Sequence, residues 1–166
     1  EYNGAAGASH VKDKITEMVH LTETLYCCAL ACSCDGHQLP SGAYYVNPLL
    51  ANVDKQNVTR FIYEICRLSH DIAGGFIATM PSEKDLNDPE IGKYMQKYLK
   101  GNGKFTTDER YRMARLIENM TGGTALVESM HGAGSPQAQR VVMARQANVE
   151  YKKTLAKRLA GIESEE

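Results

Sequence analysis

Apolar residues recur at steps of three and four positions along two long stretches of the chain. This spacing places them on one face of an α-helix. In residues 9–34 the set is Val11, Ile15, Met18, Val19, Leu25, Cys28 and Cys32. In residues 48–73 it is Leu49, Val53, Val58, Ile62, Ile65, Leu68 and Ile72. Glycines follow each stretch, at 36 and at 74–75, as stop signals. The pattern predicts two long helices, over residues 9–34 and 48–73.

Local start signals place shorter helices in the second half of the chain. Asp88-Pro89 and Ser135-Pro136 each combine an N-cap residue with proline at the first helical position. Thr106 and Glu109 have the spacing of a capping box. The sequence predicts helices over residues 88–99, 107–121, 124–130 and 136–161, a connection over 76–86, and a short extended piece at 43–46.

These elements predict an all-α fold, an antiparallel helical bundle. A length of 166 residues fits one domain. We expect a single α-helical domain over residues 1–162, followed by a frayed acidic tail at 163–166. Because the chain opens at Glu1 inside an Ala/Gly-rich phrase, we interpret it as a fragment, a processed subunit or a cut chain.

The charge is nearly balanced, with 19 Lys and Arg against 20 Asp and Glu. Nucleic-acid and membrane-surface partners favour basic patches, so neither partner is expected. No apolar run approaches the roughly 20 residues of a membrane span, and no secretory signal is visible. Because the number of cysteines is odd and no such signal is present, we expect a reducing, cytoplasmic location.

Four of the five cysteines cluster as C-C-x3-C-x-C between Cys27 and Cys34. The spacing matches neither the C-x2-C pairs of zinc sites nor the common ferredoxin run. Free cysteine commonly packs as a small apolar residue. We therefore predict packing here rather than metal binding.

The stretch from Glu128 to Arg140, ESMHGAGSPQAQR, is the most chemically suggestive part of the chain. Its glycines, at 132 and 134, let backbone approach a ligand closely. The helix that Ser135 opens has an N-terminus that attracts anionic groups such as phosphates. A plain helix–loop–helix corner would carry the same Gly and Ser-Pro signals.

Glu128 is the candidate general acid or base. Its apolar neighbours predict a desolvated carboxylate that exchanges protons near neutrality. His131 lies three residues later on the same helical face and is a candidate to orient a substrate or cofactor carbonyl. The alternatives are a surface glutamate beside a loop and a hydrogen-bonded corner histidine.

The second long helix carries a polar stripe, Asn52, Gln56 and Arg60, with Lys55 beside it. Such a stripe could bind a pyrophosphate or adenine through charge-assisted hydrogen bonds. It could equally be an intersubunit seam or a solvated face, and the solvated face is the favoured interpretation.

Five phrases carry a family resemblance: ASHVKDK at 8–14, LANV at 50–53, KQNVTRF at 55–61, DIAGG at 71–75 and the stretch from Glu128 to Arg140. They resemble the flavin-dependent 4-hydroxyphenylacetate 3-hydroxylase family, and within it the 4-hydroxybutyryl-CoA dehydratases. The similarity covers nearly the whole chain.

This resemblance implies a bundle like the C-terminal domain of acyl-CoA dehydrogenases, in a homotetramer that holds FAD between subunits. It also implies a [4Fe-4S] cluster bound by residues outside this chain, so no metal ligand is expected here. His20 and Cys27 reproduce the family's H-x6-C ligand spacing. The family phrase has Tyr and Gly-Gly inside it and Lys after it, whereas this chain has LTETLY and then Cys28, and we reject the match.

The implied reaction is dehydration of 4-hydroxybutyryl-CoA to crotonyl-CoA, with isomerisation of vinylacetyl-CoA. This chain would work beside the N-terminal part of the same enzyme and would be inactive alone. Glu128 matches a family carboxylate near the acyl-CoA substrate, so we expect acid/base work there, with His131 beside it. The residues expected to contact FAD are Lys55, Gln56, Arg60, Ser135 and Gln137. The alternatives are a flavin-dependent aromatic hydroxylase and a non-catalytic helical interaction module.

Overall fold

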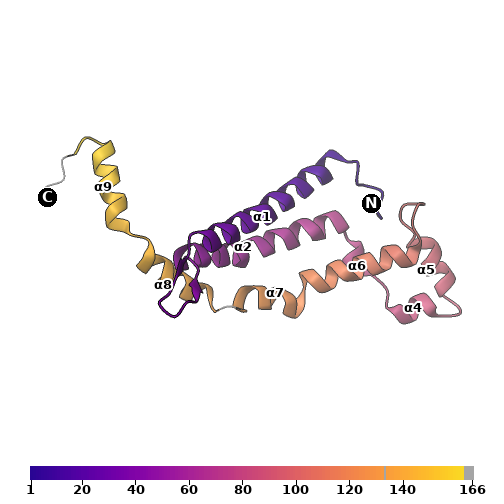
Figure 1. The fold of residues 1–166 in the computed structure, drawn as a ribbon. Coiled ribbons are helices and arrows are strands. Elements are labelled where there is room, and N and C mark those ends of the chain that lie inside the picture. The colour runs from indigo at the N-terminus through magenta and orange to yellow at the C-terminus, as the bar shows by residue number, and fades with distance from the viewer. Residues whose placement is uncertain (133, 163–166) are drawn as a thin grey trace. The chain divides into compact units, whose positions relative to one another are not determined.

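A computed structural model of the chain describes residues 1–132 and 134–162 (Figure 1). The long helices come first, α1 (Ser9–Cys34) and α2 (Pro48–Ala73). Between them strands β1 (His37–Gln38) and β2 (Tyr44–Tyr45) pair antiparallel. The shorter helices are α3 (Phe76–Thr79), α4 (Glu83–Asn87), α5 (Gly92–Tyr98), α6 (Thr107–Thr121), α7 (Gly123–His131), α8 (Pro136–Gln146) and α9 (Val149–Leu159). The predicted all-α class is confirmed.

Local sequence signals place several helix ends correctly. Both long helices have the predicted bounds. The predicted capping box forms at α6, where the Thr106 hydroxyl accepts from the Glu109 N–H at 3.1 Å and the Glu109 carboxylate accepts from the Thr106 N–H at 2.7 Å. These bonds hold the pKa of Glu109 below its usual value.

The prediction of one continuous last helix is wrong, because Asn148 separates α8 from α9. Asn148 has φ 40°, in the left-handed region that asparagine tolerates better than most residues. Its side-chain oxygen accepts from the Tyr151 N–H at 3.2 Å and so caps α9. An asparagine that both turns the chain and caps the next helix ends α8 early.

Two further expectations need correction. The connection over residues 76–86 contains α3 and α4, and α4 begins at a capping box between Ser82 and Asp85. The helix expected from Asp88 begins at Gly92, because the Asp88 carboxylate accepts from the N–H groups of Glu90 and Ile91 in a turn. In both places side-chain bonds to the backbone decide where the helix begins.

The chain divides into two compact units. Unit 1 comprises Glu1–Thr24 and Val58–Gly132, and unit 2 comprises Leu25–Asn57 and Ala133–Glu166. The expectation of one domain over residues 1–162 stays a prediction, and the tail at 163–166 lies outside the described residues.

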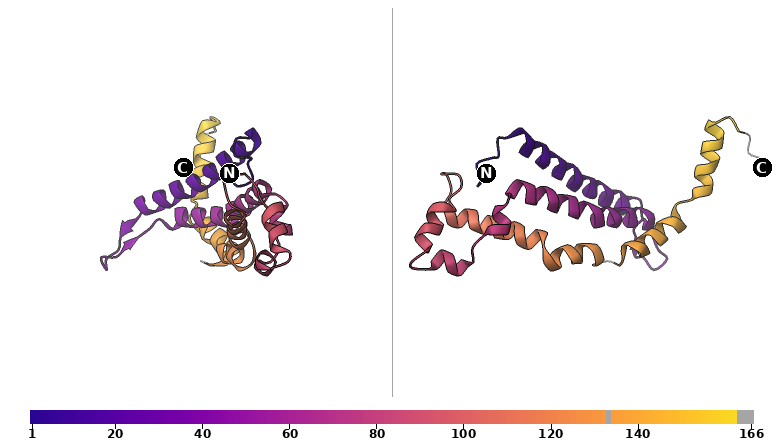
Figure 2. Two further views of the ribbon diagram at one scale, coloured as in Figure 1. Left: turned by 90° about the vertical axis from the view of Figure 1, so that its right-hand side faces the viewer. Right: turned by 180° about the vertical axis from the view of Figure 1, so that it is seen from behind.

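In unit 1, α4 packs on α5, and both α3 and α5 pack on α6 (Figure 2). The buried apolar side chains of this unit are Val11, Leu21, Cys66, Leu68, Ala73, Tyr111 and Ala114. In unit 2, the hairpin of β1 and β2 is fastened to the end of α1. The Tyr44 hydroxyl donates to the Ser33 carbonyl at 2.7 Å, and the Asn47 N–H donates to the Cys32 carbonyl at 3.0 Å.

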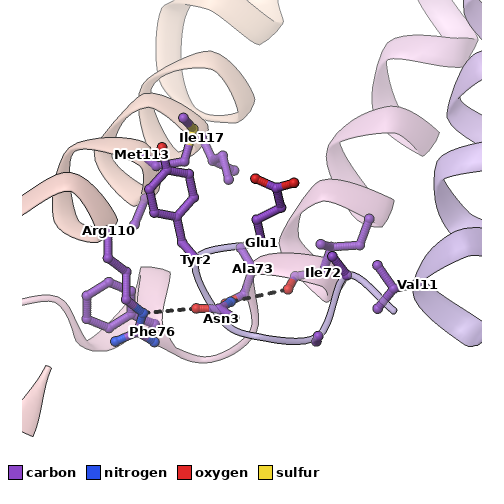
Figure 3. Close-up of a pocket in the computed structure, with 13 residues that line it drawn as sticks. Glu1, Tyr2, Asn3, Val11, Ile72, Ala73, Phe76, Arg110, Met113 and Ile117 are labelled. Carbon is purple, nitrogen blue, oxygen red and sulfur yellow. Dashed lines mark hydrogen bonds between the residues drawn. The ribbon is translucent and has the colours of Figure 1, made fainter. Parts of the chain in front are cut away.

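Arg110 joins separate segments of unit 1 beside a cavity of about 100 Å³ (Figure 3). Its Nε donates to Asn3 Oδ1 at 2.9 Å, its Nη1 donates to the Leu99 carbonyl at 2.6 Å, and its guanidinium lies 4.0 Å from the centre of the Phe76 ring. Asn3 in turn donates to the Ala73 carbonyl at 3.0 Å. One guanidinium thus fastens the N-terminal segment, the end of α5 and α3 to α6.

We predict that Arg110→Met lowers the free energy of unfolding by about 2 kcal/mol, because two hydrogen bonds from a partly buried cation are lost. Denaturant titration measures this change. Arg112→Met on the same helix is the matched control, since its ion pair with Asp108 is exposed, with 78 % of the Arg112 side chain accessible. The control should cost less than about 0.5 kcal/mol. Equal losses in the two variants would contradict the role assigned to Arg110.

Candidate functional site

Glu128 and His131 lie on α7 in unit 1, and both side chains are exposed. The described residues do not shield Glu128 as predicted, because Glu128 and the preceding Val127 are both exposed, Val127 at 57 %, although Leu126 and Met130 are half-buried. The helix continues into Gly132, whose N–H donates to the Glu128 carbonyl at 2.7 Å. A Cβ at this glycine would lie 2.8 Å from that carbonyl oxygen, so the close approach requires glycine.

Two contacts within unit 1 hold α7 in place beside α2. Near its end, the Tyr63 hydroxyl of α2 lies 3.9 Å from Met130 Sδ. Just before its start, His70 Nε2 of α2 lies 2.6 Å from the Thr121 hydroxyl. Since Thr121 donates its own proton to the Ile117 carbonyl, His70 is the donor in this pair. These two hydrogen bonds, from His70 to Thr121 and from Thr121 to Ile117, therefore fix the junction between α6 and α7.

The helix start predicted at Ser135 is confirmed. The Ser135 hydroxyl accepts from the Ala138 N–H at 3.3 Å, and Pro136 occupies the first turn. Ser135 and Gln137 are both exposed and accessible to a ligand. Proline has no N–H and the cap occupies the Ala138 N–H. The first turn therefore keeps fewer free donors for an anion than the sequence suggested.

Gln139 is a residue that the sequence analysis missed. It is 3 % exposed, the only buried residue of α8, and its Nε2 donates to the Gly134 carbonyl at 3.3 Å. Gly134 has φ 93°, a conformation that L side chains rarely adopt. The Gln139 Oε1 atom is buried without a hydrogen-bond partner. The amide thus closes the turn that precedes α8.

On α2, the solvated-face interpretation of the polar stripe is wrong at Gln56. Gln56 is 7 % exposed, and its Oε1 accepts from Arg140 Nε of α8 at 3.2 Å. Lys55 is half-buried, and Arg60 is exposed. The structure therefore brings Gln56, from the N-terminal third of α2, together with α8 in unit 2. Lys55 belongs to this unit too, whereas Arg60 belongs to unit 1 with α7.

Asp54 is a second residue without a signal in the sequence. It is half-buried, and its Oδ1 atom is buried with no hydrogen-bond partner. Burial raises the pKa of this carboxyl group. Its place in an ordinary polar run, next to Lys55, gave no reason to single it out.

The clustered cysteines vary in exposure, with Cys32 buried, Cys28 half-buried, and Cys27 and Cys34 exposed. Among the described residues, no group of three or more His, Cys, Asp or Glu side chains is placed to hold a metal ion. Within the same part of the chain, every helix is too short or too polar to span a membrane.

The described residues form an all-α chain, and comparison with known families specifies the class of helical domain. The family model described as 4-hydroxyphenylacetate 3-hydroxylase C terminal matches residues 1–161. The chain belongs to this family.

Two relatives are similar at 54 % identity. One is the 4-hydroxybutyryl-CoA dehydratase/vinylacetyl-CoA-Δ-isomerase of Clostridium aminobutyricum, over 98 % of this chain and 36 % of that protein. The other is the structure of the oxygen-tolerant archaeal 4-hydroxybutyryl-CoA dehydratase from N. maritimus, with a TM-score of 0.94 over 99 % of this chain and 34 % of that one. The chain spans about a third of the length of these relatives.

A more distant structure shares the fold. It is the oxygenase component of 4-hydroxyphenylacetate 3-monooxygenase complexed with FAD, with a TM-score of 0.81 at 21 % identity over 94 % of this chain and 33 % of that one. At this identity the likeness shows the fold alone.

We predict that Asp54→Asn raises the melting temperature at about pH 7 but not at about pH 3. The folded-state pKa lies above the ordinary value. The carboxyl group of Asp54 therefore favours the folded state most at low pH. This contribution to stability is lost as the pH rises through the raised pKa. Replacing Asp54 by Asn therefore raises the melting temperature only at pH values at which Asp54 would be ionised.

Thermal melts at both pH values test this prediction. Asp13→Asn, at an exposed position of α1, is the matched control and should change little at either pH. A stabilisation of Asp54→Asn that is the same at both pH values would contradict the prediction.

Proposed function

We propose that this chain forms part of a flavin- and [4Fe-4S]-dependent dehydratase. The enzyme converts 4-hydroxybutyryl-CoA to crotonyl-CoA and isomerises vinylacetyl-CoA. The observation that supports this proposal is the 54 % identity to the Clostridium aminobutyricum dehydratase along 98 % of the chain. The likeness to the aromatic oxygenase is much lower, at 21 % identity, and dehydration is therefore favoured over aromatic hydroxylation.

In this proposal Glu128 exchanges a proton with the acyl-CoA substrate, and His131 orients the substrate carbonyl from the same face of α7. A carboxylate is an efficient acid/base group near neutrality only when it is shielded from water. Glu128 is exposed in this chain. The shielding is therefore proposed to come from the N-terminal part of the enzyme or from another subunit of a homotetramer, and the chain alone is proposed to be inactive.

The residues present fit part of an FAD pocket. Ser135 and Gln137 are exposed at the start of α8, where backbone N–H groups and the helix dipole favour phosphate. Half-buried Lys55 adds a cation to the same unit, and exposed Arg60, which belongs to unit 1, is proposed as a separate FAD contact. When bound, FAD supplies reversible electron transfer with the substrate. These side chains would hold and orient it.

The described residues do not fit an iron–sulfur cluster, because none of their His, Cys, Asp and Glu side chains form a group that could hold a metal ion. The proposal assigns the cluster ligands to residues outside this chain. No proton transfer or binding step assigned to this chain passes through the cluster.

We predict that Glu128→Gln in the complete enzyme lowers turnover of 4-hydroxybutyryl-CoA by roughly 10²- to 10⁴-fold, with flavin content unchanged. Anaerobic formation of crotonyl-CoA measures turnover, and the visible spectrum measures the flavin. Glu150→Gln is the matched control. Glu150 is an exposed glutamate of α9 whose partner is Lys153, and its loss should leave turnover unchanged.

Three results would count against the proposal. Turnover near wild type in Glu128→Gln would remove the acid/base role. A wild-type enzyme that forms no crotonyl-CoA, but hydroxylates 4-hydroxyphenylacetate with reduced flavin and oxygen, would establish the alternative reaction. A purified enzyme without flavin would overturn both catalytic assignments.

A further inference from the structure

The one fully buried side chain of α8 is polar. Gln139 is the only buried residue among Pro136–Gln146. A helix in a protein usually owes its place to a buried apolar stripe. In α8 the apolar side chains Val142 and Met143 are only half-buried, so the hydrogen bonds of its side chains add to their packing in positioning the helix.

The bond between Arg140 and Gln56 is such a contact. It joins residues 84 positions apart in the sequence, and the amide that accepts it is 7 % exposed. Loss of a hydrogen bond to a buried amide is costly. The bond from Arg140 Nε therefore restrains α8 against the N-terminal third of α2.

The register of α8 makes this restraint relevant to ligand binding. Arg140 follows Gln137 by three residues, so the two side chains lie on the same face of the helix. The tether at Arg140 thereby sets the direction in which Gln137 points. On the neighbouring turn, the Gln139 amide holds the Gly134 carbonyl and so fixes the chain where it enters Ser135.

We propose that Gln56 and Arg140 are a positioning pair that sets the first turn of α8 so that Ser135 and Gln137 bind FAD. This inference rests on the proposed function. It changes the role of Gln56, which the sequence analysis expected to contact FAD directly. Its oxygen is engaged by Arg140, and little of its side chain is accessible to a ligand.

The test uses Gln56→Leu and Arg140→Met in the complete enzyme, singly and together. Leu keeps much of the volume of Gln56 without its acceptor, and Met keeps the apolar stem of Arg140 without its donors. Each single variant should weaken FAD binding to the apoenzyme about tenfold, and the double variant should be no weaker than either. Turnover at saturating FAD should return to within about twofold of wild type.

Two further variants test whether the hydrogen bond itself is required. Gln56→Glu restores an acceptor for Arg140 and should recover most of the FAD affinity. Arg140→Lys keeps the charge but lacks the planar Nε donor, so it should resemble Arg140→Met. Gln146→Leu, at the exposed far end of α8, is the matched control and should bind FAD like wild type.

The outcomes separate the possible roles. Lower melting temperatures with unchanged FAD affinity would reduce the pair to a structural brace and overturn the inference. Weaker FAD binding in Gln56→Leu but not in Arg140→Met would show direct contact between Gln56 and FAD, and would also overturn it. A wild-type enzyme that binds no FAD would overturn both the proposed function and this inference. If the enzyme binds FAD but the losses of FAD affinity in the two single variants add up in the double variant, only the inference is overturned.

Discussion

The hydrogen bond from Arg140 to the buried amide of Gln56 is the constraint on which the arrangement of unit 2 depends. Apolar burial is non-directional and tolerates small rotations of a helix, whereas a hydrogen bond weakens steeply with misalignment. Because the one fully buried side chain of α8, Gln139, is polar, and Val142 and Met143 are only half-buried, directional bonds add a restraint on the rotation of this helix. A helix start used to bind a ligand benefits from this, since its accessible groups must point in one direction.

A second constraint is that many large apolar side chains of the described residues are left in water. Leu159 is 89 % exposed on α9, and Val127 is 57 % exposed beside Glu128. Exposed apolar area costs about 25 cal/mol per Å² relative to burial, so such faces favour further contacts. The relatives are about three times as long as this chain. Additional protein of that size, or further subunits, would supply those contacts.

Local chemistry made much of the fold predictable from the sequence. The bounds of α1 and α2 follow from periodic apolar residues, and the start of α6 follows from a hydroxyl and a carboxylate three residues apart. Gln56 was misread as solvated because its burial depends on Arg140, far away in the sequence. The break at Asn148 was missed because its left-handed backbone has no marker in hydrophobic periodicity. Local signals predict helix ends, whereas long-range contacts decide the state of individual polar groups.

The two units differ in how much of the proposed chemistry each can complete. Holding a cofactor requires accessible polar groups at a fixed helix start. In the proposed function, unit 2 provides these groups with Ser135 and Gln137, positioned by the pair of Gln56 and Arg140. Moving a proton requires a carboxylate shielded from water, and unit 1 presents Glu128 uncovered. The cofactor contacts proposed for unit 2 are therefore accessible in this chain. The acid/base role proposed for Glu128 requires other protein to cover α7, and that proposal would couple catalysis to assembly.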